Sequence, residues 1–317
     1  MAEFSFYKDK NILVTGGAGF IPSHLVDNLV ALGSNVRVID NLSAGNIKNL
    51  EQVIDKIHFE ERNICDYKSI KNLFKDVDLV FHLAANANVP FSVDNPEIDF
   101  SSNSEGSFNV YRACVAFGVK KIVYASSAAV YGTDCKVPIS ENSILKPVSP
   151  YGASKLSGEV TGFAMSKTYD FNFTAFRIFN TYGERQPRYV IYDLIKKLNV
   201  DPHNLEVLGT GDQIRDYIHV SDTARAFLFA GFHKNSNGKV YNLAGGHPTS
   251  IKQLTRKIIE TMQLDTKVNY TGKSWKGDII NLTADIEKIK LDLGFIPKIS
   301  FEEGIIRTTN WLNDNFK

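Results

Sequence analysis

Residues 12–25, with the sequence ILVTGGAGFIPSHL, decide the fold of this chain. An apolar run ends in a glycine-rich turn, and the turn leads directly into an amphipathic segment, which predicts a strand, a tight loop and a helix N-terminus. Glycines let backbone N–H groups approach phosphates closely, and the helix dipole favours negative charge at that end. Pro22 stands where the usual spacing has a third glycine. The stretch therefore predicts a cradle for a diphosphate.

Strand and helix signals alternate around this stretch through the first half of the chain. Strands are predicted at 11–15, 35–39, 56–60, 79–82 and 121–126, and helices at 20–32, around 70–75 and at 96–117. Such alternation is typical of a parallel sheet covered by helices on both faces. We therefore predict an α/β protein with a doubly wound parallel sheet of the Rossmann type.

The alternation loosens in the second half. Helices are predicted at 151–169, 189–198, 220–232 and 250–263, strands at 173–177, 205–208 and 240–244, and a final helix that begins at Ser300 with Glu303 in a capping box. We expect the sheet domain to comprise residues 1–180 and about 216–245. A smaller α/β substrate-binding lobe would comprise about 181–215 and 246–317.

The composition is that of an ordinary globular protein, with 43% hydrophobic residues and a formal net charge of +1. Basic residues are not clustered, which argues against a nucleic-acid partner. Cys65, Cys114 and Cys135 are widely spaced, so we expect neither a disulfide framework nor a metal site, and a reducing compartment. No signal-peptide pattern and no bilayer-length apolar run is present, so we expect a cytoplasmic protein with no membrane partner.

Asp40 adds a second element to the diphosphate cradle. It ends the second predicted strand, about twenty residues after the glycine turn, where a carboxylate can hold both ribose hydroxyls of an adenosine. A carboxylate repels a 2′-phosphate, and no arginine follows it directly, which favours NAD over NADP. An aspartate at this place also serves as an ordinary turn or helix-capping residue, so the position and spacing together carry the prediction of NAD.

A serine, a tyrosine and a lysine form the candidate catalytic group. Tyr151 and Lys155 lie four residues apart in a predicted helix and project from one face. A tyrosine has a pKa near 10 in solution, and a nearby ammonium together with the positive nicotinamide is expected to lower it. Ser127 follows the strand at 121–126, at the sheet edge where ligands of doubly wound folds bind. Tyrosine and lysine at this spacing occur in many helices. The pair therefore indicates a catalytic site only in combination with Ser127 and the glycine turn.

The chain resembles the extended short-chain dehydrogenase/reductases, and among them the nucleotide-sugar epimerases and dehydratases. The motifs that carry the resemblance run in the family's order along essentially the whole chain: residues 15–24, 40–43, 82–85, 126–132, 151–155, 177–183 and 215–220. The resemblance assigns general acid/base chemistry to Tyr151. It places Lys155 on the nicotinamide ribose and the phenol, and Ser127 on the substrate hydroxyl.

The resemblance also implies sets of binding residues. Those for NAD are Gly16, Gly19, Phe20, Ile21, Asp40, Asn41, Ser43, Asn63, Ile64, Leu83, Ala84, Ala85, Asn103, Tyr151 and Lys155, where Asn63 replaces the usual aspartate near the adenine. Those for the substrate are Ser127, Asn180, Arg215 and Asp278. One departure is Trp275, which stands where the family usually has a second diphosphate-binding arginine.

The residues after Ser127 separate the possible reactions. Ala128 and Ala129 stand where dehydratases of the family carry acidic residues, and a nearby glutamate typical of decarboxylases is also missing. We therefore expect epimerisation at C4 of a nucleotide-diphosphate hexose, a UDP-sugar first, through a transient 4-keto intermediate. The alternatives are an NAD(P)H-dependent reductase of a 4-keto nucleotide sugar and a non-catalytic dinucleotide-binding regulator. The family also implies a homodimer formed through the helices at 96–117 and 151–169.

Overall fold

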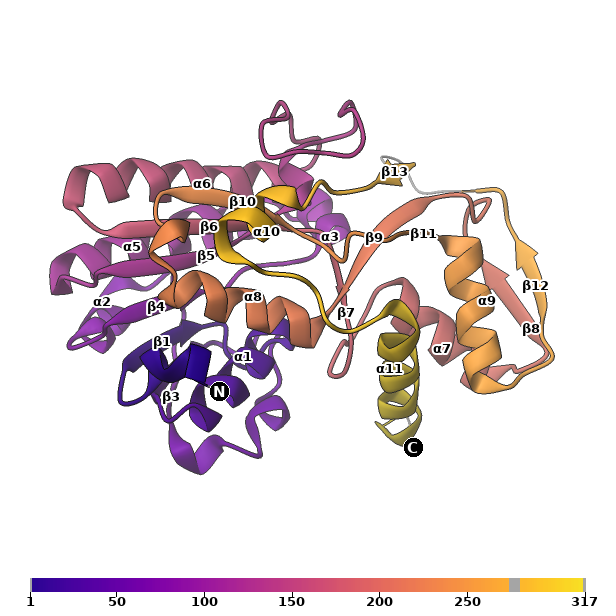
Figure 1. Ribbon diagram of the computed structural model, residues 1–317, viewed down its shortest axis with the longest axis horizontal. Coiled ribbons are helices and arrows are strands. Elements are labelled where there is room, and N and C mark those ends of the chain that lie inside the picture. Colours follow the sequence, from indigo (N-terminus) through magenta and orange to yellow (C-terminus); the bar gives the residue numbers. More distant parts are fainter. Residues whose placement is uncertain (1, 274–279, 316–317) are drawn as a thin grey trace.

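The computed structural model describes residues 2–273 and 280–315. Its main feature is a parallel seven-stranded sheet in the order β10-β6-β5-β4-β1-β2-β3 (Figure 1). The strands are β1 (Asn11–Thr15), β2 (Asn35–Asp40), β3 (Ile57–Glu61), β4 (Leu79–His82), β5 (Lys121–Ser127), β6 (Asn172–Ile178) and β10 (Lys239–Leu243). The chain reverses its direction of winding after β3, because β4 pairs with β1 on the other side. The predicted doubly wound α/β fold is thereby confirmed.

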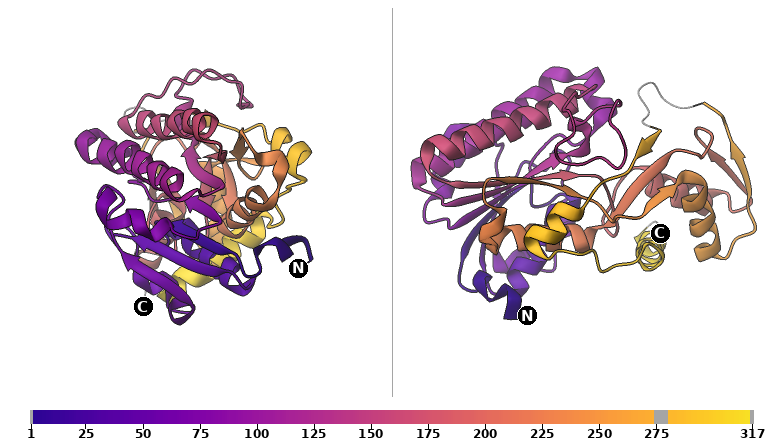
Figure 2. Two further views of the ribbon diagram at one scale, coloured as in Figure 1. Left: turned by 90° about the vertical axis from the view of Figure 1, so that its left-hand side faces the viewer. Right: turned by 45° about the horizontal axis from the view of Figure 1, so that its top comes forward.

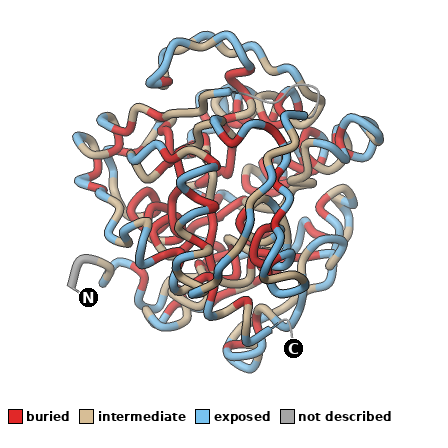
Figure 3. Tube along the Cα trace, turned by 90° about the vertical axis from the view of Figure 1, so that its right-hand side faces the viewer, coloured by how far each residue is buried: buried red, intermediate tan, exposed pale blue. Residues whose placement is uncertain are grey.

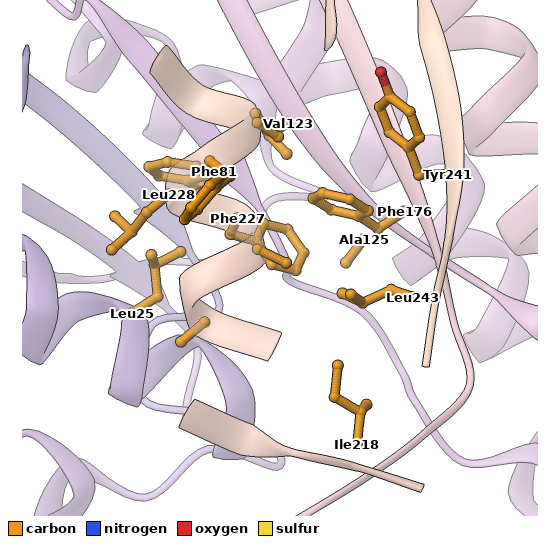
Figure 4. Close-up of a cluster of buried hydrophobic side chains, with 14 of the residues drawn as sticks. Leu25, Phe81, Val123, Ala125, Phe176, Ile218, Phe227, Leu228, Tyr241 and Leu243 are labelled. Atoms are coloured by element: carbon orange, nitrogen blue, oxygen red, sulfur yellow. The ribbon is translucent and has the colours of Figure 1, made fainter. Parts of the chain in front are cut away.

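Helices cover both faces of this sheet. The helices α1 (Phe20–Ala31) and α8 (Val220–Phe232) pack together on one face, and α2 (Tyr67–Ile70), α5 (Gly106–Phe117) and α6 (Pro150–Tyr169) lie on the other (Figure 1). Both faces of the sheet need to be covered because consecutive side chains of a strand point to opposite faces, and Leu13 and Val14 are both apolar. Leu13 packs among residues of α5, whereas Val14 packs among residues of α1 and α8. Figure 4 shows Leu25 of α1 and Phe227 of α8 beside the sheet residue Phe81.

The long helix predicted at 96–117 is built of three consecutive pieces. They are α4 (Pro96–Phe100), a π-helical turn η5 (Ser101–Glu105) and α5, which ends at Gly118 with a φ of 68°. A further helix that the pattern did not predict, α3 (Val89–Asp94), precedes them. Helices α4 and α5 both pack on α6.

A smaller lobe contains the other strands and lies beside the carboxyl edge of the large sheet (Figure 2). One sheet joins β7 (Asn180–Tyr182), β9 (Ile214–His219), β11 (Pro248–Ser250) and β13 (Asn281–Leu282), and a second joins β8 (Asn204–Val207) to β12 (Lys267–Tyr270). They pack with α7 (Val190–Val200), α9 (Ile251–Met262) and α11 (Phe301–Asn315) around a separate apolar core. Figure 3 shows buried segments in the interior and exposed residues on the outer turns.

Two segments lie elsewhere than the expected domain boundaries place them. Strand β9 belongs to the smaller sheet, although its residues from 216 onward were expected in the sheet domain. Helix α10 (Glu287–Leu293) packs beside β10 of the large sheet, although it was expected in the substrate lobe. The division into two domains otherwise stays a proposal.

Within the described ranges, none of the helices combines the length and the apolar character that crossing a membrane requires.

Candidate active site

The glycine turn after β1 is held tightly against the loop that follows β4. Gly16 has a φ of 72°, and a Cβ at this position would lie 2.7 Å from the Cα of Ala84. Gly19 caps helix α1 without a side chain, so the first backbone N–H groups of the helix face the carboxyl edge of the sheet. Phe20 and Ile21 form the first helical residues. The turn therefore has the open backbone that a diphosphate site needs.

Asp40 lies at the end of β2, next to this turn, and is buried. Its Oδ2 accepts a hydrogen bond from the N–H of Ala18 at 2.9 Å, and its Oδ1 accepts one from Leu42 at 2.8 Å. Burial raises the pKa of Asp40, and these N–H groups act in the opposite direction. A carboxylate offers about four acceptor positions, and the backbone N–H groups of Ala18, Leu42 and Asn41 do not fill all of them, so Asp40 keeps acceptor capacity for the ribose of an adenosine. The residues present therefore fit NAD.

The other predicted adenosine contacts form small local turns. Asn41 Oδ1 accepts hydrogen bonds from the backbone N–H and the hydroxyl of Ser43, at 3.1 Å and 2.7 Å. Asn63 Oδ1 accepts one from Cys65 N–H at 2.9 Å, which occupies part of the side chain predicted to meet the adenine. Ile64 is buried, and its carbonyl accepts from Asn109 Nδ2 at 3.1 Å.

A buried polar chain fixes the loop after β4, where Leu83, Ala84 and Ala85 are expected to line the cofactor. The N–H of Ala84 donates to Thr15 Oγ1 at 3.1 Å, and Thr15 Oγ1 lies 2.7 Å from Nδ1 of His82. Complete burial lowers the pKa of His82 to about 3, so the imidazole is neutral and serves only as a hydrogen-bonding link.

Ser127, Tyr151 and Lys155 come together at the carboxyl end of β5. Ser127 is the last residue of β5, and Tyr151 and Lys155 lie in the first half of α6, which packs on that strand. The hydroxyl of Ser127 makes a hydrogen bond with Tyr151 and also accepts one from the N–H of Ala129 at 3.2 Å. The ammonium of Lys155 is buried and donates to the carbonyl oxygen of Ala125 at 2.7 Å.

In the protein by itself, burial outweighs the influences that lower the pKa of Tyr151, and the expected lowering by Lys155 together with the nicotinamide stays a prediction. Burial raises the pKa of Tyr151 well above its ordinary value, because a phenolate loses its hydration there. The hydrogen bond with Ser127 acts in the opposite direction and is the larger of the lowering influences. Burial also lowers the pKa of Lys155 to about 7.

Asn103 lies in the π-helical turn η5 and forms a buried polar centre there. Its Oδ1 accepts from the N–H of Asn86 at 2.7 Å, and its Nδ2 donates to Ser154 Oγ at 3.0 Å and to Asp99 Oδ1 at 3.1 Å. Asp99 was not predicted as a site residue. Its spacing of four from Asn103 on one helical segment was the available signal.

On the substrate side, Asn180 and Arg215 lie on neighbouring parallel strands, β7 and β9. Asn180 Nδ2 is buried, and in the described part of the chain it has no hydrogen-bond partner, so it is a donor available to a ligand. Arg215 donates to the carbonyl oxygen of Ile214 at 2.9 Å and is paired in register with Leu282 of β13. Asp278 and Trp275 lie outside the described residues.

Two residues of the loop before α7, Arg188 and Tyr189, bind the loop after β4 from the smaller lobe. The hydroxyl of Tyr189 and the guanidinium of Arg188 both donate to the carbonyl oxygen of Ala87, at 2.5 Å and 2.9 Å. Both side chains influence the pKa of Tyr151, which Arg188 lowers and Tyr189 raises. The sequence showed this loop only as polar and basic, because its contact with residue 87 depends on the tertiary fold.

Asp222, in the first turn of helix α8, anchors a distant segment. The N-cap residue of this helix is His219. Asp222 Oδ2 accepts hydrogen bonds from the N–H groups of Lys298 and Ile299, both at 2.8 Å, and thereby anchors the segment before α11.

These features define a dinucleotide-binding α/β enzyme in which a tyrosine and a lysine lie beside the cofactor site. Residues 12–244 match a model of the NAD dependent epimerase/dehydratase family, and the chain belongs to this family. It is 32% identical to the UDP-glucose 4-epimerase of Mycolicibacterium smegmatis over 310 residues, 95% of this chain and 98% of the relative. It is also 32% identical to the mouse dTDP-D-glucose 4,6-dehydratase, over 97% of this chain and 90% of the relative.

A solved structure agrees with these relatives. The UDP-glucose 4-epimerase of Thermotoga maritima, determined with UDP-glucose, has a TM-score of 0.91 and 35% identity to this chain. The structural similarity covers 97% of this chain and 100% of that structure. The family, its dependence on NAD and the Rossmann-type fold are thus established for this chain.

Proposed function

We propose that this protein is an NAD-dependent 4-epimerase of a nucleotide-diphosphate hexose, with a UDP-sugar as the first candidate substrate. The observation that carries the proposal is the meeting of Ser127, Tyr151 and Lys155 at the carboxyl end of β5, beside a cradle that fits NAD. Relatives that are named UDP-glucose 4-epimerase match over nearly the whole chain, which supports the UDP-linked hexose.

In this proposal each side chain has a defined task. Tyr151 takes the proton of the sugar O4 hydroxyl and later returns it, while Ser127 holds the same oxygen by a hydrogen bond. Lys155, anchored on the carbonyl of Ala125, adds positive charge next to the phenol. Bound NAD would supply the chemistry of a reversible hydride acceptor for C4 of the sugar. Asn180 and Arg215 hold the diphosphate, so that the sugar can turn about its link.

A dehydratase matches this chain about as well in identity, so the residues after Ser127 decide between the reactions. Water elimination needs acidic groups that take and give protons at neighbouring carbons. The turn after β5, η6 (Ala128–Val130), offers only apolar side chains there, and Ala128 is buried. Epimerisation needs none of these groups, which favours it.

Cofactor stoichiometry tests the proposal against the reductase alternative. The purified protein is incubated with UDP-, GDP-, CDP- and dTDP-hexoses, and the products are separated by chromatography. An epimerase converts its substrate with the NAD that it carries and needs none added. Consumption of added NADH by a 4-keto sugar, with no C4 epimer from any nucleotide sugar, would refute the proposal. A protein that binds NAD but does neither would be a regulator.

We further propose that the protein is a homodimer formed through the faces of α4, α5 and α6. Large apolar side chains are exposed there, with Phe100 61%, Val160 58% and Phe108 45% exposed. A hollow of about 320 Å³ between α4 and α6 gives this face a concave region where side chains of a second copy can pack. Sedimentation velocity should show a dimer for the wild type and a monomer for Phe100→Ser/Val160→Ser. Ile144→Ser, at a loop residue that is even more exposed, should stay dimeric. A monomeric wild type contradicts this proposal.

A further inference from the structure

A buried carboxylate lies against the outer side of the catalytic helix α6. Asp99 of α4 has no solvent exposure, and its Oδ2 accepts a hydrogen bond from the hydroxyl of Ser154 at 2.6 Å. Its Oδ1 accepts from Asn103 Nδ2 at 3.1 Å and from Asn86 Nδ2 at 3.3 Å. Asp99 therefore ties together three segments: the catalytic helix, the turn η5 and the loop that continues from the expected nicotinamide contacts.

The buried ammonium of Lys155 needs a compensating charge. Lys155 is 3% exposed, and within the described part of the chain its ammonium contacts two neutral groups: the carbonyl oxygen of Ala125 at 2.7 Å and the ring of Tyr124, whose centroid is 5.1 Å away. A buried cation without a nearby anion is costly. The charge of Asp99 acts on Lys155 and raises its pKa, against the effect of burial. The same charge raises the pKa of Tyr151.

Other charged or titratable groups also face this pair. Arg188 and Tyr189 face Tyr151 from the smaller lobe, and Arg188 adds positive charge. Tyr124 of β5 and His82 of β4 face the pair from the sheet, and His82 is neutral because burial holds its pKa near 3.

Glu159, one turn further along α6, is committed to Arg177 in an ion pair at 2.5 Å. Among the described residues that act on Lys155, Asp99 is thus the available anion.

We infer that Asp99 is a positioning residue for the Tyr151–Lys155 pair. Its carboxylate orients α6 through Ser154 and supplies the negative charge that keeps the Lys155 ammonium protonated. This inference rests on the proposed roles of Tyr151 and Lys155 in the epimerase reaction.

Two variants separate the charge of Asp99 from its hydrogen bond. Asp99→Asn keeps the size and still offers an acceptor to Ser154, but removes the charge. Ser154→Ala removes the hydrogen bond and keeps the charge. Both are assayed as holoenzyme for the pH dependence of kcat/KM with UDP-glucose and UDP-galactose, which reports ionisations of the enzyme before the sugar binds. The ultraviolet absorbance of the Tyr151 phenolate is titrated in parallel, with Tyr151→Phe as the background.

The negative charge of Asp99 raises the pKa of both Lys155 and Tyr151. Asp99→Asn should therefore move the acidic and the basic limb of the kcat/KM profile to lower pH, by about one unit. The phenolate titration should move in the same direction. Ser154→Ala should lower kcat with both limbs in place, and Asp99→Glu, which keeps the charge, should also leave them in place. Asp99→Ser is a second neutral variant, with room for water, should the amide fold poorly.

The inference is overturned if the two limbs of the kcat/KM profile stay in place in both Asp99→Asn and Asp99→Ser. It is also overturned if the two limbs move in opposite directions. Tyr151→Phe tests the proposed function separately. Full activity in that variant refutes the assigned base, whereas an inactive Tyr151→Phe together with unmoved limbs in Asp99→Asn refutes only the role of Asp99.

Discussion

Tyr151 is held from both its backbone and its side chain. Its backbone N–H donates to the hydroxyl of the buried Ser92 at 3.1 Å, and its phenol shares a hydrogen bond with Ser127. This fixation lets the phenol meet one oxygen of the substrate, as general acid/base chemistry requires. Because burial raises the pKa of Tyr151 in the protein by itself, the phenolate that takes the O4 proton depends on positive charge, which Lys155 and a bound nicotinamide would supply.

The hydroxyl of Tyr151 is therefore expected to be indispensable. Tyr151→Phe removes only that hydroxyl and should lower kcat by about 100-fold or more, because the proton of O4 has no other acceptor of this kind. Binding of NAD, measured by retained cofactor after gel filtration, should be close to that of the wild type. Tyr169→Phe is the matched control, at the exposed far end of the same helix, and should keep full activity.

At the scale of elements, the strand–turn–helix unit of β1 and α1 explains the proline in the glycine motif. Pro22 is the third residue of α1, and the first hydrogen bond of the helix is donated by the next residue, Ser23, to Gly19 at 3.1 Å. The N–H that proline lacks would have had no partner within the helix. Proline therefore costs the turn nothing in hydrogen bonding.

Pro22→Gly should leave the affinity for NAD unchanged, because the cradle consists of backbone that precedes residue 22. Gly16→Ala should abolish binding, because its Cβ would lie 2.7 Å from the Cα of Ala84 at a φ of 72°. Isothermal titration of protein stripped of cofactor measures both variants. A large loss of affinity in Pro22→Gly would show that the proline itself shapes the turn.

A buried ion pair joins the catalytic helix to the sheet. Arg177 of β6 and Glu159 of α6 are both 4% exposed, with Nη2 and Oε1 at 2.5 Å, and Glu159 also accepts from Ser126 at 2.8 Å. Glu159→Gln should lower the free energy of unfolding by about 3 kcal/mol or more, because Arg177 loses its counter-charge.

Denaturant unfolding measures this loss, and the exposed pair Arg256–Glu260 provides the control. That pair has a similar distance, 2.8 Å, but its side chains are 83% and 50% exposed. Glu260→Gln should cost less than about 1 kcal/mol. Equal losses at the two sites would mean that burial does not decide the strength of the inner pair.

At the scale of the whole molecule, Glu184 connects elements of the smaller lobe with helix α1 of the sheet domain. Its carboxylate lies 3.1 Å from Arg307 of α11 and 3.2 Å from His219 of β9, and its carbonyl oxygen lies 2.9 Å from the ring of His24 on α1. Burial raises the pKa of Glu184, but its hydrogen bonds and the charges of His219 and Arg307 outweigh burial and lower it to about 2.

This junction should weaken in acid. A carboxyl group with a lower pKa in the folded state stabilises the fold fully above its unfolded pKa of 4.5 and loses that contribution as the pH falls towards 2. Glu184→Gln should therefore be less stable than the wild type at about pH 6, by about 3 kcal/mol, and the difference should shrink at about pH 3. A constant difference for Glu184→Gln would contradict the assignment.

The sequence was sufficient for the large sheet because central strands such as β1 and β4 are apolar runs that end at a turn. It was insufficient for β9, since Arg215 and Asp216 interrupt the apolar pattern, and for β13, which has only two residues. The glycine turn, Asp40 and the pair Tyr151 and Lys155 could be proposed as site residues from their spacing along the sequence, and their roles stay predictions. The role of Asp99 could not be predicted from the sequence. Acidic residues on helices are usually exposed to solvent, and only the tertiary fold shows that this one is buried.

The order of strands in the large sheet has a consequence for how the protein is made. Its edge strand β10 is supplied by residues 239–243, after the chain has left to build β7, β8 and β9. During synthesis the backbone of β6 therefore stays unpaired on one side until these residues leave the ribosome. An open, apolar strand edge invites pairing with other nascent chains. A nascent chain stalled before residue 239 is thus the form of this protein with the greatest need for a chaperone.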